Sequence, residues 1–316
     1  CALVTWWKHS PSVSVEKPGH NYFNSNRIMQ FPELNYNFNF SVTYINKEIS
    51  IAYHDAGSGE NVLLFIHGLA SYIPAWTKLI PLLKDNFRCV AIDLPGYGKS
   101  SAGVLDGTVK FYTEVISLFI KKLSLENVTL VGHSMGGQIS IAAALEFPSL
   151  IKKLVLMAPA GFETFSEQEK LLIKKYNTDQ FYFSANDDEI FASFRSNFFK
   201  MNDDVKPMIN DRIKMKAWKN FGDYCKVVAN SLNGLLDCPV YDKLSNIIQP
   251  TLIFFGKNDK WIPNKNLHKN ITTESIAHNG ASKVPHSKLI MIDECGHFIP
   301  YEHPDLLARE IKSFTL

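Results

Sequence analysis

The segment Asn127-Val-Thr-Leu-Val-Gly-His-Ser-Met-Gly-Gly-Gln-Ile-Ser140 decides the fold of this chain. Its first part, residues 128–131, is uncharged and rich in β-branched side chains, which predicts a buried strand. Residues 138–147 are rich in Ala, Ile and Leu and precede Pro148, which indicates a helix. The pattern G-x-S-x-G at residues 132–136 lies between the two. The sequence therefore predicts a sharp strand-to-helix turn with a serine at its tip.

Each residue type in this turn has a physical reason. Ser134 must adopt a strained backbone conformation, and Gly132 and Gly136 leave room where the strand and the helix pass close together. The serine hydroxyl is then lifted above the carboxyl edge of the sheet. The N–H of Met135 opens the helix and can donate to a developing oxyanion. A glycine-rich turn that contains serine by chance is the alternative, but the flanking strand and helix argue against it.

Composition limits the classes of function. A length of 316 residues suits one large domain or a domain with an insertion, and 46% hydrophobic with 20% charged residues is typical of globular proteins. The formal net charge of +2 indicates no nucleic-acid partner. The five cysteines show no paired spacing, so neither a disulfide framework nor a metal site is predicted. No apolar stretch reaches the length of a transmembrane helix.

The N-terminal region is predicted to be a separate segment. Residues 1–37 are polar and contain many Asn and Ser, which indicates a leader laid over the surface. Cys1 followed by Ala2 resembles the start of mature bacterial lipoproteins, and the apolar residues 1–7 also fit the tail of a hydrophobic anchor. Either interpretation predicts a lipid or membrane anchor and an exported or envelope-bound protein. Without such an anchor we expect a cytoplasmic protein.

Apolar strands alternate with helical segments along most of the chain. A predicted hairpin covers residues 38–45 and 48–54, and the further strands are expected at 62–66, 87–92, 128–131, 151–157, 251–256 and 288–292. Helices are expected at 74–84, 108–123, 138–147 and 304–314. This alternation predicts an α/β fold whose mostly parallel sheet is covered by helices on both faces. Active sites of such sheets lie at the carboxyl ends of the strands.

Residues 162–246 interrupt this alternation. They are helical in pattern and rich in aromatic residues, and they contain no clear buried strand. We therefore expect a helical cap over the active site, inserted into a core formed by residues 38–161 and 247–316. The region 1–37 precedes that core.

A serine nucleophile needs a base and an acid that orients the base. His297 follows the strand predicted at 288–292 and is the candidate base, because the other histidines belong to different motifs or to polar stretches. Asp259 is the first acid after the strand at 251–256 and is the candidate acid. Asp293 is a rival, although it lies only four residues before the histidine. The order Ser134, Asp259, His297 is typical of one hydrolase fold.

These motifs together resemble the α/β-hydrolases, in particular the capped, esterase-like members. The resemblance covers residues 40–316 and rests on His67-Gly68-Leu69, Asp93-Leu-Pro-Gly-Tyr-Gly-Lys-Ser100, Gly-His-Ser-Met-Gly-Gly137, Gly-Lys-Asn-Asp259 and Cys-Gly-His297. It implies that the N–H of Leu69 is the second oxyanion donor, opposite Met135. The stretch between Asp259 and His297 is longer and more polar than is usual in the family, and we expect it to form a surface loop.

The resemblance implies an enzyme that cleaves carboxylic esters through an acyl-enzyme and needs neither cofactor nor metal. Aromatic side chains should line an enclosed apolar pocket for a small or medium hydrophobic ester. Arg195 and Lys200 are among the few charged candidates to anchor a substrate there. The predicted pocket residues are Phe162, Phe194, Phe198, Trp218 and Phe298.

Alternatives remain open at the level of sequence. A hydrolase of carbon–carbon bonds in aromatic ring-cleavage products would use a cap arginine and an aromatic residue near the base, for which Arg195 and Phe298 are the candidates. Lactonase, peptidase and lipase activities also fit the motifs. A ligand-binding receptor on the same fold is the alternative outside the enzymes, and the complete set of Ser, His and Asp argues against it.

Overall fold

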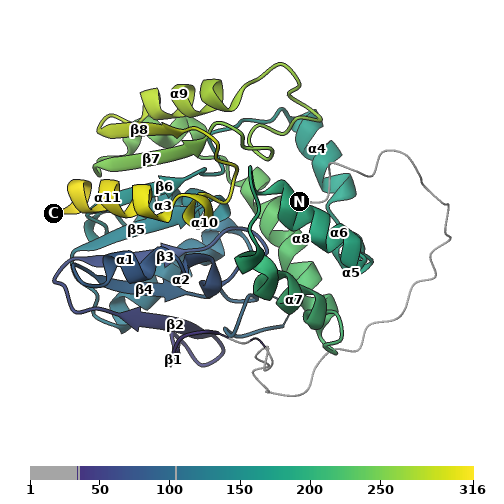
Figure 1. Cartoon of the computed structure of the whole chain (residues 1–316), viewed down its shortest axis with the longest axis horizontal. Coiled ribbons are helices and arrows are strands. Elements are labelled where there is room, and N and C mark those ends of the chain that lie inside the picture. The colour runs from purple at the N-terminus through teal and green to yellow at the C-terminus, as the bar shows by residue number, and fades with distance from the viewer. Residues whose placement is uncertain (1–33, 35, 104) are drawn as a thin grey trace.

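A computed structural model describes residues 34, 36–103 and 105–316 (Figure 1). Its centre is an eight-stranded sheet with helices on both faces, and the predicted α/β fold class is confirmed. The strand order is β1-β2-β4-β3-β5-β6-β7-β8. The strands are β1 (Ser41–Tyr44), β2 (Ser50–Ala56), β3 (Val62–Ile66), β4 (Arg88–Ile92), β5 (Val128–His133), β6 (Lys153–Met157), β7 (Thr251–Gly256) and β8 (Ser287–Ile292).

The pairing of the strands sets where the functional loops meet. β1 and β2 form the predicted antiparallel hairpin, and β2 also pairs antiparallel with β4. All the other neighbours are parallel, so their carboxyl ends lie along one edge. In the register of β3 and β5, Ile66 lies opposite Gly132. The loop after β3 therefore begins directly beside the serine turn.

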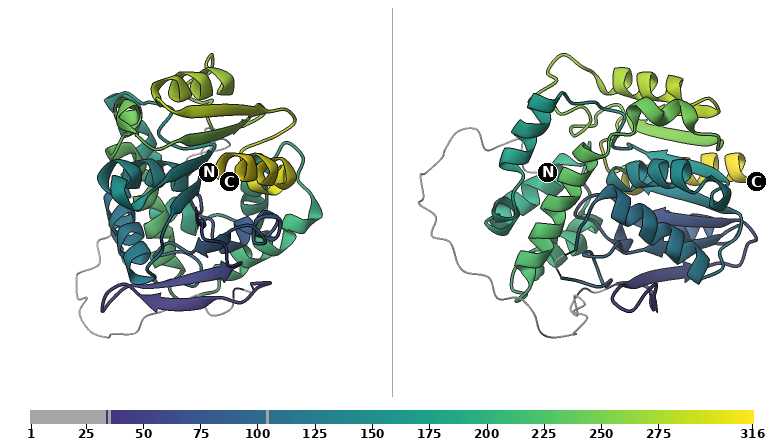
Figure 2. Two further views of the ribbon diagram at one scale, coloured as in Figure 1. Left: turned by 90° about the vertical axis from the view of Figure 1, so that its left-hand side faces the viewer. Right: turned by 180° about the vertical axis from the view of Figure 1, so that it is seen from behind.

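Helices cover both faces of the sheet. α1 and α11 pack together on one face, and α2 and α3 pack together on the other (Figure 1, Figure 2). Thr108 caps the start of α2 by accepting the N–H of Phe111 at 3.2 Å. These helices are α1 (Ile80–Leu83), α2 (Val109–Lys122), α3 (Met135–Glu146) and α11 (Pro304–Thr315), and short 3-10 turns lie at Ile73–Trp76 and Pro148–Leu150.

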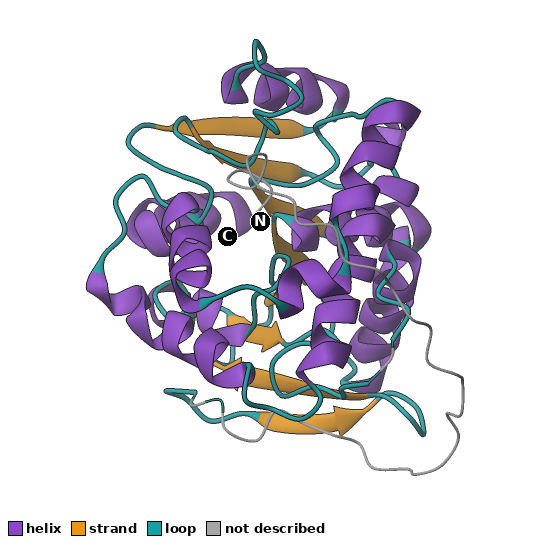
Figure 3. Ribbon diagram, turned by 90° about the vertical axis from the view of Figure 1, so that its right-hand side faces the viewer, coloured by secondary structure: helices purple, strands orange, loops and turns teal. Residues whose placement is uncertain are grey.

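Residues 162–246, called the helical insertion below, lie beside the edge where the parallel strands end (Figure 1, Figure 3). Its helices are α4 (Glu167–Tyr176), α5 (Asp179–Phe183), α6 (Asp187–Ser196), α7 (Lys206–Met215) and α8 (Phe221–Asp237), with 3-10 turns at Asp203–Val205 and Tyr241–Asn246. Capping boxes start α4 at Ser166 and α6 at Asn186. α8 is bonded to the core, because the amide of Gln138 on α3 donates to the carbonyls of Leu235 and Cys238 at 3.0 and 2.8 Å.

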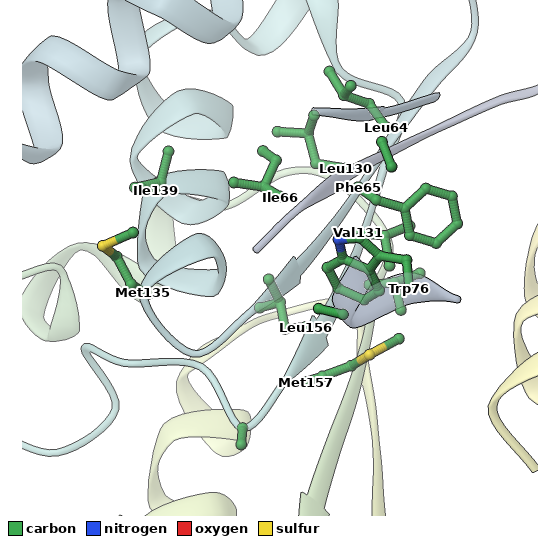
Figure 4. Close-up of a cluster of buried hydrophobic side chains, with 14 of the residues drawn as sticks. Leu64, Phe65, Ile66, Trp76, Leu130, Val131, Met135, Ile139, Leu156 and Met157 are labelled. Carbon is green, nitrogen blue, oxygen red and sulfur yellow. The ribbon is translucent and has the colours of Figure 1, made fainter. Parts of the chain in front are cut away.

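The core lies between the sheet and its helices. The central strands are mostly apolar, with Thr129 of β5 buried and β6 beginning at Lys153, because parallel strands covered on both faces have no solvent side. Trp76 packs on Phe65 with ring centroids 5.2 Å apart. Figure 4 shows this cluster, in which Leu64, Phe65, Ile66, Trp76, Leu130, Val131, Met135, Ile139, Leu156 and Met157 are labelled and all are buried.

Two expected elements differ from the structure. The single helix expected at 74–84 is a 3-10 turn followed by the four-residue helix α1. The surface loop expected between Asp259 and His297 contains the helix α9 (Thr273–Lys283), which packs on β7 and β8. Thr272 starts it with a capping box to Ser275, in which serine takes the place of the usual Glu or Gln. Its polar composition reflects a helix with one buried face, formed by Ile276, Ala277, Gly280 and Ala281.

The N-terminal leader expected at 1–37 is also corrected at its end. Leu34 is buried against the core, and the phenol of Tyr36 donates to the buried carboxylate of Asp93. These two residues belong to the packed structure. Cys1 and the anchor expected there lie outside the described residues.

Some features concern only the part of the chain that the structure describes. Among its helices, none combines the length and apolar character needed to cross a bilayer. No group of three or more His, Cys, Asp or Glu side chains that could hold a metal ion occurs in these residues. Cys89, Cys225, Cys238 and Cys295 are free thiols.

Candidate active site

Ser134 lies on a strained turn between β5 and α3. Its φ of 53° and ψ of −115° are rare for a residue with a side chain. Hydrogen bonds hold this conformation: its N–H donates to Met157 at 2.9 Å, and its carbonyl accepts from Gly137 and Ala160 at 2.9 and 3.0 Å. A Cβ on Gly136 would fall 2.1 Å from the carbonyl oxygen of Ile66. Only glycine fits there, which explains the second glycine of the motif.

His297 and Asp259 meet although they come from different loops. Nδ1 of His297 lies 2.7 Å from Oδ2 of Asp259, and both side chains are buried. The second oxygen of Asp259 accepts the N–H groups of Trp261 and Ile262 at 2.7 and 3.1 Å. The rival acid, Asp293, is on the surface, where it pairs with Lys257 at 2.8 Å. Because Nδ1 is engaged, Nε2 is the nitrogen of His297 that remains for a substrate or a nucleophile.

Two further histidines beside the site are held neutral. Burial lowers the pKa of His133 to about 3 and that of His67 to about 4. His133 donates from Nε2 to the carbonyl of His297 at 2.8 Å. His67 donates from Nδ1 to the carbonyl of Gly68 at 2.8 Å and accepts the N–H of Leu94 on Nε2 at 3.0 Å. Both imidazoles therefore hold backbone segments in place.

The loop after β3 is fixed by buried carboxylates from two directions. Asp93 accepts the N–H of Ile73 at 2.7 Å, and Asp211 of α7 accepts the phenol of Tyr72 at 2.7 Å. The guanidinium of Arg212, the next residue on α7, donates to the carbonyl of Ala70. Burial raises the pKa of Asp93 to about 6, against the hydrogen bonds that favour its ionised form. The loop that carries Leu69 is thus held by both the core and the helical insertion.

Two cavities meet at the serine. Cavity 1 has a volume of about 130 Å³ and cavity 2 of about 300 Å³. Leu69, Ser134 and His297 line both of them. The N–H of Met135 opens α3 at the same place, and first-turn N–H groups of a helix have no acceptor within the helix. A bond attacked by Ser134 can therefore have its two halves in different cavities.

Cavity 1 is walled by aromatic side chains. Phe194, Phe198 and Phe298 line it, as do Phe181, Tyr182, Phe221 and Tyr224. Phe162 and Trp218 line neither cavity, which corrects two expected pocket residues. The ring of Phe162 is buried between Phe255 and Gly280 of α9, and Trp218, three residues after the end of α7, is partly buried against the core.

The charged groups at the site also differ from expectation. Arg195 and Lys200 are exposed and line neither cavity. Arg212 takes that place: it lines cavity 1, and its guanidinium carbon lies 5.1 Å from the centre of the Tyr224 ring. No local motif marks this residue. Its only sequence signal is that it lies in a helical, aromatic-rich segment.

Cavity 2 is larger, and both apolar and polar side chains line its wall. Its apolar wall includes Ile173, Leu232, Leu235 and Leu236, and its polar wall includes Gln138, Lys260 and Asn264. Glu163 also lines it, hydrogen-bonded to the ring of His268 and to the N–H of Asn264 at 2.8 Å. Burial raises the pKa of Glu163. Sequence reasoning missed Glu163 and His268, because they lie 105 residues apart in the chain.

Comparisons with known proteins agree with this arrangement. A model of the α/β hydrolase fold family matches residues 61–304. The chain belongs to the α/β hydrolase fold family. It is 26% identical to the uncharacterized hydrolase YugF of Bacillus subtilis over 277 residues, which cover 83% of this chain and 92% of the relative.

Two more relatives extend the comparison. The chain is 24% identical to the 2-hydroxy-6-oxononadienedioate/2-hydroxy-6-oxononatrienedioate hydrolase of Escherichia coli K12, over 87% of this chain and 93% of that enzyme. Among solved structures, a probable hydrolytic enzyme of Pseudomonas aeruginosa PAO1 superposes with a TM-score of 0.80 at 19% identity, covering 90% and 96% of the two chains. At this identity the structural likeness shows the fold alone.

Proposed function

We propose that the chain is a serine hydrolase that cleaves carboxylic esters of small to medium hydrophobic acyl or aryl groups through an acyl-enzyme. One observation carries the proposal. A buried His297–Asp259 pair and the strained Ser134 converge where two cavities meet. A nucleophile, a base and an orienting acid in this order are the parts that acyl transfer requires.

The proposed mechanism follows from which atoms are engaged. Nε2 of His297 takes the proton of the Ser134 hydroxyl as the oxygen attacks the ester carbonyl. Asp259 fixes the imidazole through Nδ1 and stabilises its protonated form. The N–H groups of Leu69 and Met135 donate to the oxyanion. His297 then gives the proton to the leaving alcohol, and a water activated by the same nitrogen releases the acid.

The two cavities suggest how an ester is divided. The aromatic cavity 1 suits a compact apolar acyl or aryl group, whereas cavity 2, with its mixed wall, suits the leaving alcohol. The helical insertion supplies most of the aromatic wall of cavity 1, and we propose that it acts as a cap that excludes water. A cavity of about 130 Å³ favours a short acyl group over the chain of a long lipid.

Labelling with a fluorophosphonate tests the nucleophile. We expect covalent modification of Ser134, located by peptide mass spectrometry, and no modification of Ser134→Ala. Ser134→Ala should also lose ester turnover by several orders of magnitude while keeping its circular dichroism spectrum. Absence of labelling together with tight binding of an unhydrolysed ligand would favour the receptor alternative. Rates of hydrolysis of a panel of p-nitrophenyl esters and lactones then show which type of bond the enzyme cleaves.

A carbon–carbon bond hydrolase is the second candidate, and Arg212 favours it. The name of the Escherichia coli relative denotes a dicarboxylate substrate. In this chain Arg212 lines cavity 1, whose wall is largely aromatic but also includes Glu189, and its guanidinium can pair with a substrate carboxylate. Arg195, the arginine expected from the sequence, is exposed and serves as the control.

Matched variants distinguish the two candidates. The substrates are a vinylogous diketone that carries a carboxylate and an uncharged p-nitrophenyl ester. If the carbon–carbon reaction is the natural one, wild type prefers the diketone, and Arg212→Met raises its KM at least about tenfold by removing a charge-assisted contact. Arg195→Met should leave both reactions unchanged. A wild-type preference for the uncharged ester contradicts the second candidate.

A further inference from the structure

We propose that Glu302 is a positioning residue that holds the His297 loop and the insertion segment 197–200 together as one unit. The inference rests on the proposed function, because it takes His297 as the base. Glu302 ends the short helix α10 (Ile299–Glu302) and touches no reacting atom in the proposed mechanism.

The carboxylate of Glu302 joins two segments far apart in the chain. Its Oε2 accepts the N–H of Gly296, the residue before His297, at 2.7 Å. Its Oε1 accepts the N–H groups of Phe199 and Lys200 at 2.9 and 3.1 Å. Three backbone donors thus share one partly buried carboxylate, and each oxygen serves a different segment. Neither a neutral amide nor a shorter acid can accept all three bonds in the same geometry.

The two segments are also in direct backbone contact. A Cβ on Gly296 would lie 2.6 Å from the carbonyl oxygen of Asn197 and 2.7 Å from the nitrogen of Phe199. The N–H of Phe298 donates to that carbonyl of Asn197 at 2.9 Å. Phe298, after His297, is therefore bonded to the insertion, and Gly296, before it, packs against the insertion and is linked to it through Glu302. Opening of this contact should displace the base.

The same contact shapes cavity 1. Asn197, Phe198 and Phe298 all line it, and the rings of Phe198 and Phe298 meet edge to face with centroids 5.4 Å apart. Glu302 therefore couples the closure of the aromatic cavity to the placement of the imidazole. Loss of the coupling should lower turnover of every ester, because a small displacement of a base is enough to slow proton transfer.

A second contact between the core and the insertion provides a matched control for Glu302. Lys78 pairs with Asp204 at 2.5 Å and lies over the ring of Tyr301 at 4.7 Å. It joins the core to the insertion close to Glu302 without a bond to residues 295–298 in the described structure. Lys78→Met removes that link, together with a bond from Nζ to the carbonyl of Tyr301 at 3.3 Å, but it removes no bond to Gly296 or to residues 197–200.

The experiment compares Glu302→Gln, Lys78→Met and wild type. Initial rates are measured with p-nitrophenyl acetate and p-nitrophenyl benzoate between pH 5 and 9. For Glu302→Gln we expect kcat to fall about tenfold or more with both esters. KM for the acetate should change little, and the acid limb of the pH profile should shift, because the imidazole loses its fixed surroundings. Lys78→Met should keep kcat and the pH profile.

Two readouts do not depend on activity. Amide hydrogen exchange in Glu302→Gln should be at least about tenfold faster in one of the two segments, either at Gly296 or at Phe199 and Lys200, because the single amide oxygen cannot accept from both. NMR of ¹³C-labelled histidine should show a displaced His297 resonance in this variant and not in Lys78→Met. Both variants should fold, which circular dichroism checks.

Unchanged exchange at Gly296, Phe199 and Lys200 together with an unchanged His297 resonance would overturn the inference. So would equal losses of kcat in Glu302→Gln and Lys78→Met, since that result indicates only a general loosening of the insertion. Failure of the proposed function has a different signature. Wild type would then hydrolyse no ester and Ser134 would resist labelling, and the exchange and NMR data would decide the role of Glu302 alone.

Discussion

Nδ1 of His297 lies 2.7 Å from Oδ2 of Asp259, a residue 38 positions earlier in the chain. The other oxygen of the carboxylate is held by two N–H groups of its own loop, those of Trp261 and Ile262. The loop thus orients the acid, and the acid orients the base. The bond selects the imidazole tautomer in which Nε2 is free of its proton and can accept one.

Replacing each carboxylate by an amide should show whether Asp259 or Asp293 orients the base. Asp259→Asn should lower kcat by roughly 10⁴, the scale seen when the orienting acid of such a site becomes an amide and favours the wrong tautomer. Asp293→Asn should have little effect, because this side chain is 80% exposed and pairs only with Lys257 at the surface. Steady-state kinetics with a p-nitrophenyl ester measures both. A reversal of the two effects would show that the acid is assigned to the wrong residue.

The buried His133 should make the protein less stable in acid. The unfolded chain takes up a proton at an ordinary pKa of about 6.5, whereas burial lowers the folded-state pKa of His133 to about 3. Between these values the unfolded state binds more protons, so stability is full above about pH 6.5 and falls as the pH falls. Between pH 7.5 and pH 5 this group should cost roughly 2 kcal/mol of unfolding free energy.

Urea denaturation at the two pH values tests this contribution. His133→Gln keeps a donor in the side chain but cannot be protonated, so its loss of stability in acid should be smaller. His278→Gln, at an exposed site, is the control and should behave as wild type. Asp93, whose pKa is raised to about 6, acts in the opposite direction in all three proteins. The same pH dependence in His133→Gln and wild type would contradict the prediction.

The size of cavity 1 predicts a preference among acyl groups. We expect a higher kcat/KM for butyrate and benzoate esters than for emulsified long-chain triglyceride or for peptides, because cavity 1 beside Ser134 has a largely aromatic wall and a volume of about 130 Å³. Parallel assays of p-nitrophenyl butyrate, p-nitrophenyl benzoate and triolein measure the ratio. A higher kcat/KM for triolein is incompatible with an enclosed cavity.

The phenol of Tyr36 should stabilise the fold although it lies at the edge of the N-terminal region. It donates to the buried carboxylate of Asp93, which also holds the loop after β3. Tyr36→Phe should lower the free energy of unfolding by about 1–3 kcal/mol, the range for a hydrogen bond to a charged group. Tyr44→Phe, on a side chain that is 49% exposed, is the control and should change stability little. Equal effects of the two substitutions would argue against a structural role for Tyr36.

Local patterns were sufficient for much of the fold. The apolar runs of β3, β5, β6 and β7 stand out because a strand covered on both faces has few polar positions. The serine turn is visible because close backbone contacts admit only glycine at Gly136. Asp259 and His297 could be found because each follows a strand whose carboxyl end must reach the same edge. Each of these inferences uses only the residue types close to the residue in the sequence.

The amino-acid sequence was enough to predict the α/β class and to propose Ser134, Asp259 and His297 as the site residues. Only the packed structure shows which aromatic residues face the cavities, because the wall of cavity 1 is built from several separate elements and the spacing within one element does not show what that element faces. It placed Phe162 in the core and Arg212 in cavity 1. It also paired Glu302 with Gly296 and Tyr72 with Asp211. Such contacts depend on how separate elements pack in space, and no local spacing encodes them.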